Sequence, residues 1–450
     1  MLDVKSKITS FFIFNSSFGP KEGDELKRIL FYHPSQPADA RKMQVGLCEA
    51  VVKFMSTFSS QPCEALQTQT KRYIFYQPEK GYWMVLVVRI PYTTKALSAI
   101  GESPGEVVDP LVMHDLLVSA YKMFKMFRGP FKDIATENIY TICDQFFSLY
   151  ILSRNITNDV SDVIQGINYL PLDKNSFFKV LCFIDLLEVN YPDLKCISVV
   201  YDEQLLWNGL ATNDMLTLYQ YLVQTLIPKQ VEKEIQGGPI AAAQRHGRFI
   251  SPPEGIRSNE DLQKLVKVHL MREDENETKQ YYLIIYRTLS ATICFTIDVN
   301  INLELETFRS LDAFIGPQLS AIASTISEQC TTHALQAAQL ANSEHKFVYF
   351  NRLNLAFKSS PPINKLHPST SIKPEVLSII AGIHSDRKSL GNYGEIIIKT
   401  PDEFWITGKS SNEREFYVII QEKNANLKEI ADEVKRICEA QMKGIFFYPM

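Results

Sequence analysis

The sequence predicts an α/β protein of three tandem modules, each an antiparallel sheet with flanking helices. The chain has 450 residues, 45% hydrophobic and 22% charged, which is the composition of a globular protein with several domains. Short aromatic and β-branched runs alternate with helical patterns, and the order strand, strand, helix, strands, closing helix starts three times. We expect the first module at 8–155, a connecting helical segment at 156–195, the second module at 196–332 and the third at 345–450.

The first module combines two strands, a helix and two further strands with a pair of closing helices. Apolar residues at helical spacing predict the closing helices within 111–153, and Gly129-Pro130 separates them. The other expected elements are strands at Phe11–Phe14, Ile29–Tyr32, Arg72–Tyr76 and Tyr82–Ile90, and a helix at 41–58.

The second module carries a loop insertion at 232–258, which is rich in Gly and Pro. Gly316-Pro317 is expected to kink its long closing helix or to split it in two. The acidic run Glu273–Glu277 is typical of a hairpin turn. The other expected elements are helices at 176–190 and 214–227, and strands at Ile197–Tyr201, Leu205–Leu210, Leu265–Leu270, Tyr281–Arg287 and Thr292–Ile297.

The third module shows one strand, Phe347–Phe357, where the other modules have two. Either this is a long bent strand or the module is incomplete. Asn426 and Glu429 have the spacing of a capping box that opens the closing helix. The other expected elements are a helix from Pro374 and strands at Glu395–Lys399, Phe404–Thr407 and Phe416–Gln421.

Charge and cysteine patterns narrow the function classes. The 47 Lys and Arg against 51 Asp and Glu give a net charge of −4, which provides no broad basic footprint for nucleic acid. The apolar runs are far shorter than the ~20 residues of a membrane-spanning helix, and the N-terminus lacks a secretory signal, so we expect a cytoplasmic protein. The eight Cys include no C-x-x-C pair and are expected to be reduced thiols.

Two short strings imitate catalytic motifs. Gly101-Glu102-Ser103-Pro104-Gly105 matches a nucleophile elbow, but Pro104 has no N–H for the oxyanion hole and the surroundings have loop composition. Gly408-Lys409-Ser410 resembles the end of a phosphate-binding loop, but Glu403 stands where the first glycine belongs and no helix follows. We expect a hairpin turn there. The eight His show no metal-ligand spacing, so the sequence predicts no metal, no cofactor and no covalent catalysis.

The helix expected at 41–58 is apolar over most of its circumference. Its stripe of Leu47, Val51, Phe54 and Phe58 suffices to cover a sheet. Val45, Cys48, Val52 and Met55 lie beside that stripe and broaden the apolar arc, so the helix needs cover on more than one side. Either the helices at 111–153 provide that cover, or a second protein does.

Several strings in the first module are distinctive: Ser10-Phe-Phe-Ile-Phe-Asn15, Phe18-Gly-Pro20, Glu22-Gly23, Ile29-Leu-Phe-Tyr-His-Pro34, Val45-Gly-Leu-Cys-Glu-Ala50, Tyr82-Trp-Met-Val85 and Val87-Val-Arg89. With these strings the chain resembles the calcium, caffeine and zinc sensitivity family of vacuolar fusion proteins. The resemblance is dense over about the first 90 residues, looser through the second module and weakest in the third.

The resemblance implies three tandem longin domains and a heterodimer with a monensin-sensitivity family protein. It further implies that the heterodimer is a guanine-nucleotide exchange factor for the late-endosomal Rab GTPase, Rab seven, in endosome maturation, lysosome or vacuole fusion and autophagy. A third regulatory subunit is expected in animals, with peripheral recruitment to late endosome and lysosome membranes through the complex. Exchange in this family needs no covalent catalytic residue.

The family implies that the first longin domains of both subunits together form the Rab platform, and we place this chain's share on the helix at 41–58 and the neighbouring strands. The candidate Rab or partner contacts are Arg41, Gln44, Val45, Cys48, Glu49, Val52, Lys53 and Met55. Of these, Arg41, Gln44, Glu49 and Lys53 are expected to face solvent, and charge reversal at Lys53 with Arg41 is expected to weaken exchange without harming the fold. The alternative function is a longin scaffold or adaptor that binds another small GTPase, a coat or a tether.

Overall fold

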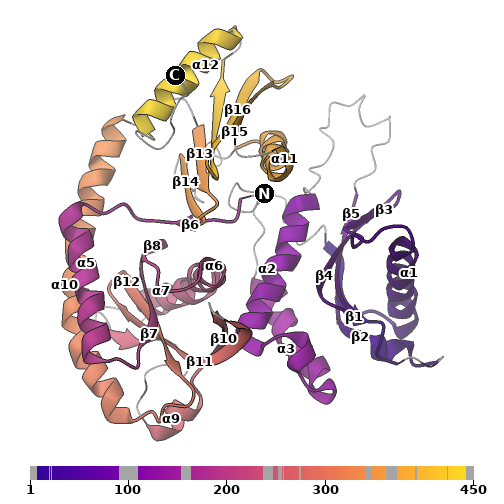
Figure 1. Ribbon diagram of the computed structural model, residues 1–450, viewed down its shortest axis with the longest axis horizontal. Helices are drawn as coiled ribbons and strands as arrows, with labels where there is room; N and C mark the ends of the chain where they lie inside the picture. Colours follow the sequence, from indigo (N-terminus) through magenta and orange to yellow (C-terminus); the bar gives the residue numbers. More distant parts are fainter. Residues whose placement is uncertain are drawn as a thin grey trace. The chain divides into compact units, whose positions relative to one another are not determined.

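The computed structural model describes residues 8–19, 21, 23–90, 110–153, 164–236, 247–251, 256, 258–272, 275–340, 346–360, 372–390, 393–422 and 424–441. The chain forms two compact units, Met1–Val163 and Ile164–Met450. The first unit holds one module and the second holds two, and each module is an antiparallel sheet with helices on both faces (Figure 1).

The first module has a five-stranded sheet in the order β2-β1-β5-β4-β3. The predicted strands and helices of this module are confirmed, and the short edge strand β3 is an addition. Its elements are β1 (Ile8–Asn15), the 3-10 turn η2 (Glu25–Arg28), β2 (Ile29–His33), α1 (Ala38–Ser56), β3 (Ala65–Gln67), β4 (Lys71–Glu79), β5 (Tyr82–Arg89), α2 (Pro110–Arg128), the 3-10 turn η3 (Phe131–Asp133) and α3 (Thr136–Ser153).

The two faces of this sheet are covered by different helices. Helix α1 lies on one face, over a core that includes Phe12 and Phe14. Helices α2 and α3 lie on the opposite face (Figure 1), where the rings of Phe124 and Phe147 stack with centroids 5.2 Å apart. The explanation that residues 111–153 cover the outer side of α1 is therefore wrong, because successive side chains of a strand point to opposite faces and each face takes its own helices.

The second module repeats the strand order of the first, as β10-β11-β12-β7-β8. Helices α5 and α10 pack together on one face, and α6 and α7 lie on the other (Figure 1). Its elements are α5 (Lys174–Asn190), β7 (Lys195–Tyr201), β8 (Gln204–Trp207), α6 (Thr212–Tyr221), the π-helical turn η4 (Leu222–Leu226), α7 (Ile227–Gln236), β9 (Arg248–Phe249), α9 (Asn259–Gln263), β10 (Lys267–Arg272), β11 (Glu275–Thr288), β12 (Ala291–Asp298) and α10 (Leu305–Leu340).

Two predictions for the second module need correction. Helix α10 continues through Pro317, so the alternative that it splits in two is wrong, whereas the alternative of a kink stays a prediction. Buried Leu311, Ile315 and Leu319 hold both halves on one core and offset the proline's cost of about 3 kcal/mol. The predicted loop insertion begins within α7, and strand β9 inside it pairs with β11. The antiparallel pairing of β10 and β11 confirms a hairpin here, but Glu275–Glu277 of the acidic run lie inside β11, and residues 273–274 lie outside the described residues.

The third module has the complete strand order, so the single strand predicted at Phe347–Phe357 is wrong. Two antiparallel strands replace it, and the turn between them includes Leu355 at a φ of 54°. The capping box is confirmed: the backbone N–H of Glu429 donates to Asn426 Oδ1 at 3.0 Å, and that of Asn426 to Glu429 Oε2 at 2.9 Å. The elements are β13 (Lys346–Asn351), β14 (Ala356–Ser360), α11 (Pro374–Leu390), β15 (Tyr393–Lys399), β16 (Phe404–Ser411), β17 (Arg414–Gln421) and α12 (Leu427–Gln441).

The hairpin turn predicted at Gly408–Ser410 is also wrong, because these residues lie inside β16. The turn falls at Asn412 and Glu413, whose φ values of 47° and 62° suit a tight hairpin. Gly408 instead allows α11 to approach the sheet, since a Cβ there would lie 3.0 Å from Ile383 Cγ2.

A short strand, β6 (Ile167–Asn168), joins the second and third modules. It pairs in parallel with β14, and Tyr169 forms a bridge with Leu205 in β8. The Ile167 N–H donates to Leu355 O at 2.7 Å, and the Leu170 N–H donates to Leu205 O at 3.0 Å. This segment therefore covers the exposed edges of two sheets at once.

Candidate functional site

Helix α1 presents large apolar side chains to solvent. Among the described residues, nothing covers Met43, Leu47, Phe54, Met55 and Phe58, which are 79%, 46%, 63%, 39% and 74% exposed. Four of them lie on α1, and Phe58 lies in the turn two residues after its end; we call these five residues the outer face of α1. The rings of Phe54 and Phe58 contact each other, with centroids 4.9 Å apart. Contiguous exposed apolar side chains of this size are typical of a protein–protein contact surface.

The inner side of α1 uses smaller apolar residues. Val45 and Cys48 are buried against the sheet, and Val52 packs at its edge. Burial raises the pKa of the Cys48 thiol to about 12, so at neutral pH this group is a protonated packing residue rather than a nucleophile.

Polar side chains anchor α1 to the sheet at one end. The Tyr32 hydroxyl donates to Gln44 Oε1 at 2.6 Å, and Gln44 Nε2 donates to Ser10 Oγ at 2.9 Å. Gln44 thus links α1 to both β2 and β1. Because each partner is at least half-buried, this network fixes the helix rather than offering free groups to a ligand.

A charge cluster anchors α1 near its middle. Glu49 is buried, and its carboxylate accepts hydrogen bonds from Arg28 Nη1 at 3.0 Å and from Lys53 Nζ. Burial alone would raise the pKa of Glu49, but the hydrogen bonds from Lys53 and Arg28 outweigh it and hold the pKa below its ordinary value. Glu49 is therefore charged and paired at neutral pH.

The structure changes the placement of several candidate contacts. Glu49 is buried and Gln44 is half-buried, so the expectation that both face solvent is wrong. Arg41 is half-buried, and its buried Nε has no hydrogen-bond partner among the described residues. Lys53 and Met55 are exposed, whereas Val52 is half-buried and Val45 and Cys48 are buried. Of the eight candidates, only Lys53 and Met55 lie where a partner could reach them without rearrangement of the helix.

The structure confirms that α1 is apolar over most of its circumference, but the predicted assignment of its two sides is wrong. The sequence predicts that Leu47, Phe54 and Phe58 belong to the stripe that covers the sheet, but the structure leaves all three exposed on the opposite side. Helical periodicity alone cannot rank two apolar stripes. The hydrogen-bonding residues Gln44 and Glu49 flank Val45 and Cys48, and this grouping is the signal that marks the inner side.

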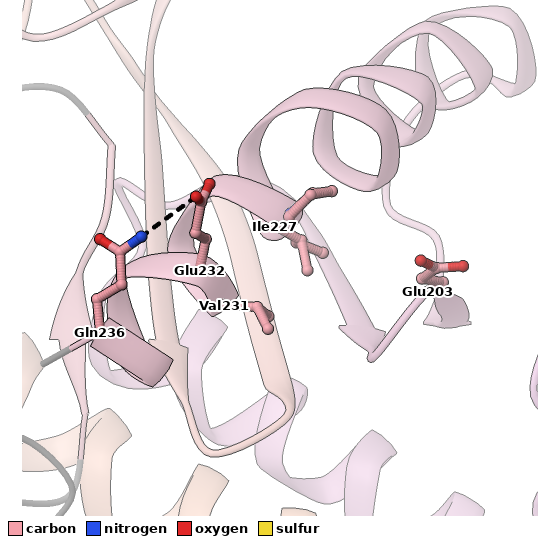
Figure 2. Close-up of a pocket in the computed structure, with 6 residues that line it drawn as sticks. Glu203, Ile227, Val231, Glu232 and Gln236 are labelled. Carbon is pink, nitrogen blue, oxygen red and sulfur yellow. Dashed lines mark hydrogen bonds between the residues drawn. The ribbon is translucent and has the colours of Figure 1, made fainter. Parts of the chain in front are cut away.

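A hollow in the second module offers a second contact surface of different chemistry. Its volume is about 420 Å³, and Figure 2 shows α7 along one wall and Glu203 on the other side. Ile227, Pro228 and Val231 form an apolar floor, and Gln236 Nε2 donates to Glu232 Oε1 at 3.2 Å. The lining combines aliphatic side chains with carboxylates and an amide, which suits contact with another molecule rather than nucleophilic catalysis.

Within the described ranges, no three His, Cys, Asp or Glu side chains come together as a metal site. No helix there is both long and apolar enough to cross a membrane. The string Gly101–Gly105 lies outside the described residues.

Comparison with known proteins identifies the three modules. The model "First Longin domain of INTU, CCZ1 and HPS4" matches residues 8–129. The models of Intu longin-like domains 2 and 3 match residues 195–321 and 341–437. The vacuolar fusion protein CCZ1 homolog of Xenopus tropicalis is 37% identical over 98% of this chain and 97% of its own length. The chain belongs to the CCZ1 family.

Other CCZ1 homologs align equally completely. Those of Nematostella vectensis and Dictyostelium discoideum are 36% and 27% identical, each over 98% of both chains. The prediction of three tandem longin-like modules is confirmed by the three domain models and by the shared strand order. In CCZ1-family terms, the outer face of α1 belongs to the first longin domain.

Proposed function

We propose that this chain is one subunit of a heterodimeric guanine-nucleotide exchange factor that activates the late-endosomal Rab GTPase, Rab seven. The other subunit is a monensin-sensitivity family protein, and in animals a third, regulatory subunit joins them. The complex acts in endosome maturation, lysosome or vacuole fusion and autophagy, and is recruited peripherally to those membranes. Membership of the CCZ1 family of vacuolar fusion proteins supports this proposal.

The observation that carries the proposal is the outer face of α1 in the first longin domain. Exposing two phenylalanines and three other large apolar side chains on one helix is unfavourable unless another protein covers them. The hydrogen bonds of half-buried Gln44 and the ion pair of buried Glu49 fix α1 on the module, so the face is prepared for binding before a partner arrives.

Nucleotide exchange needs no covalent step. A protein that binds the nucleotide-free GTPase more tightly than the nucleotide-bound form shifts the equilibrium toward release, and each tenfold difference in affinity corresponds to about 1.4 kcal/mol. Contact surfaces alone can supply that difference. In the proposed mechanism, the paired longin domains bind the switch regions and leave the nucleotide poorly held.

The test is release of a fluorescent GDP analogue from a panel of Rab GTPases. The full chain, the monensin-sensitivity family partner and the co-purified pair are each added separately. We expect acceleration only with the pair and selectively for Rab seven.

A pair that forms but accelerates no Rab would contradict exchange activity. Stable binding of a coat, a tether or another small GTPase without exchange would instead establish the scaffold function. The two functions therefore give different results in the same set of purified proteins.

A further inference from the structure

Helix α5, in the second longin domain, is apolar on two opposite sides. Its inner stripe, which includes Val180, Phe183 and Leu187, is buried in the core of the module. Its outer stripe follows the spacing i, i+4, i+8, i+11 with Phe178, Cys182, Leu186 and Val189, all of them exposed. A helix with a second apolar stripe needs a second covering element.

Three residues of the outer stripe, Phe178, Cys182 and Leu186, line one wall of a groove whose other wall is α10. The groove has a volume of about 780 Å³. Its α10 side is made of short side chains, Ala321 and Thr325, together with Gln318 and Ile322, so the hollow lies between large residues on α5 and small ones on α10. Cys182 lies in its lining between Phe178 and Leu186.

Contacts at both ends of the groove fix the two helices relative to each other. At one end, the Tyr191 hydroxyl lies 2.7 Å from Ser310 Oγ and its ring lies 5.7 Å from that of Phe314. At the other end, Gln329 Nε2 donates to Ser176 Oγ at 2.7 Å. The helices are thus antiparallel, and the groove exists before any ligand binds.

The shape of the groove selects a helix as its occupant. An extended peptide binds by adding to an open sheet edge, whereas a groove between two helices accepts a third helix whose side chains interdigitate with theirs. The lining on α5 runs from Asn175 to Leu186, a length of about 17 Å at 1.5 Å per residue, which matches about three helical turns.

Charge selects the kind of helix. Among the described lining residues, Lys179 alone is charged. At the nearby end of the groove, Lys174 Nζ lies 5.9 Å from the centre of the Phe178 ring, and Asp173, which accepts from Gln329 Nε2, offsets the charge of Lys174, so Lys179 gives this part of the groove its net positive charge. A positive charge at one end of an apolar groove favours an acidic side chain at that end of the ligand. Two lysines fall short of the four to eight basic residues typical of an anionic lipid site.

We propose that the groove between α5 and α10 binds an amphipathic α-helix of a partner protein, with apolar residues on Phe178 and Leu186 and an acidic residue beside Lys179. This contact is separate from the outer face of α1 and from nucleotide exchange. It gives the second longin domain a binding role of its own.

The test follows alkylation of Cys182 in the full chain, measured by mass spectrometry at that residue. The probes are helical peptides of about 14 residues. Leucines at helical spacing form one apolar face, the positions of these leucines differ between peptides, and the residue beside that face is glutamate, glutamine or lysine. We expect glutamate peptides to slow alkylation about tenfold or more, and lysine peptides to bind at least about fivefold more weakly. Lys179→Glu should reverse that preference.

Leu186→Glu should abolish protection, while Leu353→Glu, at an exposed apolar residue outside the groove, should leave it unchanged. Far-ultraviolet circular dichroism and a thermal unfolding midpoint equal to wild type would show that each variant is folded, and protection is taken as the ratio of each variant's own alkylation rates without and with peptide, because a new carboxylate near Cys182 itself slows alkylation. Protection that survives Leu186→Glu, or no protection by any peptide, would overturn the proposal. Protection by phosphatidylserine vesicles, or by raising the chain concentration alone, would also overturn it in favour of a membrane or a second copy.

Discussion

Glu415, in β17, is a buried carboxylate held by three side chains from three elements. Arg352 Nε and the Tyr417 hydroxyl donate to it, and His384 Nδ1 lies 2.6 Å from Oε2. Burial alone would raise the pKa of Glu415, but the hydrogen bond and charge of His384, with Tyr417 and Arg352, hold it below its ordinary value. The carboxylate therefore links α11 and the β13–β14 turn to the sheet.

Glu415→Gln should destabilise the third longin domain by about 2–3 kcal/mol at pH 7, because it leaves Arg352 without its anionic partner. A folded pKa below the unfolded value of about 4.3 means that the stabilisation is present at higher pH and is lost as pH falls through the folded pKa. Urea unfolding followed by Trp405 fluorescence, with Trp83 and Trp207 replaced by Phe, measures both effects. A difference between variant and wild type that stays constant from pH ~7 to ~3 would contradict this account.

Lys53 pairs with buried Glu49 one turn earlier on α1. Lys53→Glu should therefore destabilise α1 by about 1 kcal/mol or more through like-charge repulsion, whereas Lys53→Gln should cost about half as much. Hydrogen exchange of the α1 amides measures this. Equal exchange rates in the two variants would show that repulsion from the charge of Glu49 does not affect the stability of α1. Charge reversal at Lys53 is thus unsuitable as a test of partner binding, because it also disturbs the fold.

The short strand β6 ties the second and third longin domains at the scale of elements. A Cβ added to Gly166, just before it, would lie 2.3 Å from Phe357 Cβ in β14. Gly166→Ala should therefore push β6 away from β14. We expect exchange of the Ile167 amide, which donates to Leu355 O, to rise about tenfold or more.

The matched control is Gly382→Ala in α11, where an added Cβ meets nothing within 4 Å. This substitution should leave hydrogen exchange of the Ile167 amide unchanged. It should leave exchange of the α11 amides unchanged or slower, since alanine favours helix over glycine by about 1 kcal/mol. A wild-type exchange rate of the Ile167 amide in Gly166→Ala would show that the pairing of β6 with β14 does not depend on the close approach of Gly166 to Phe357.

Most helices and strands could be predicted because their apolar periodicity agrees with their tertiary environment. The exceptions have identifiable physical causes. Packing of Leu311, Ile315 and Leu319 carries α10 through Pro317. In the β13–β14 turn the left-handed residue is Leu355, which is neither Gly nor Asn. The turn signal lies instead in Asn351 and Asn354, whose Oδ1 atoms accept from the N–H groups of Leu353 and Ala356. The placement of a contact site on α1 stays a prediction, but the predicted assignment of the helix's two sides is wrong, because α1 has two apolar stripes and only the sheet decides which one is buried.

At the scale of the whole molecule, the three longin domains share one strand order but differ in what their helices leave exposed. The first unit exposes the outer face of α1, and the second unit exposes the outer stripe of α5. Both helices are apolar on two sides. We infer that each of these helices binds a different partner. In this way a protein built from one repeated fold can bind several proteins.

The central claim is that the outer face of α1 supports exchange on Rab seven. Phe54→Asp with Phe58→Asp removes the aromatic pair, and Leu149→Asp is the control, at a residue 69% exposed on α3 of the same module. Exposed substitutions of this kind should change the free energy of unfolding by about 0.5 kcal/mol or less.

The decisive measurement is the rate of GDP release from Rab seven by the assembled pair containing each variant. The account predicts at least about a tenfold loss with Phe54→Asp/Phe58→Asp and a wild-type rate with Leu149→Asp. A wild-type rate with the double variant, in a folded and fully assembled pair, would contradict it.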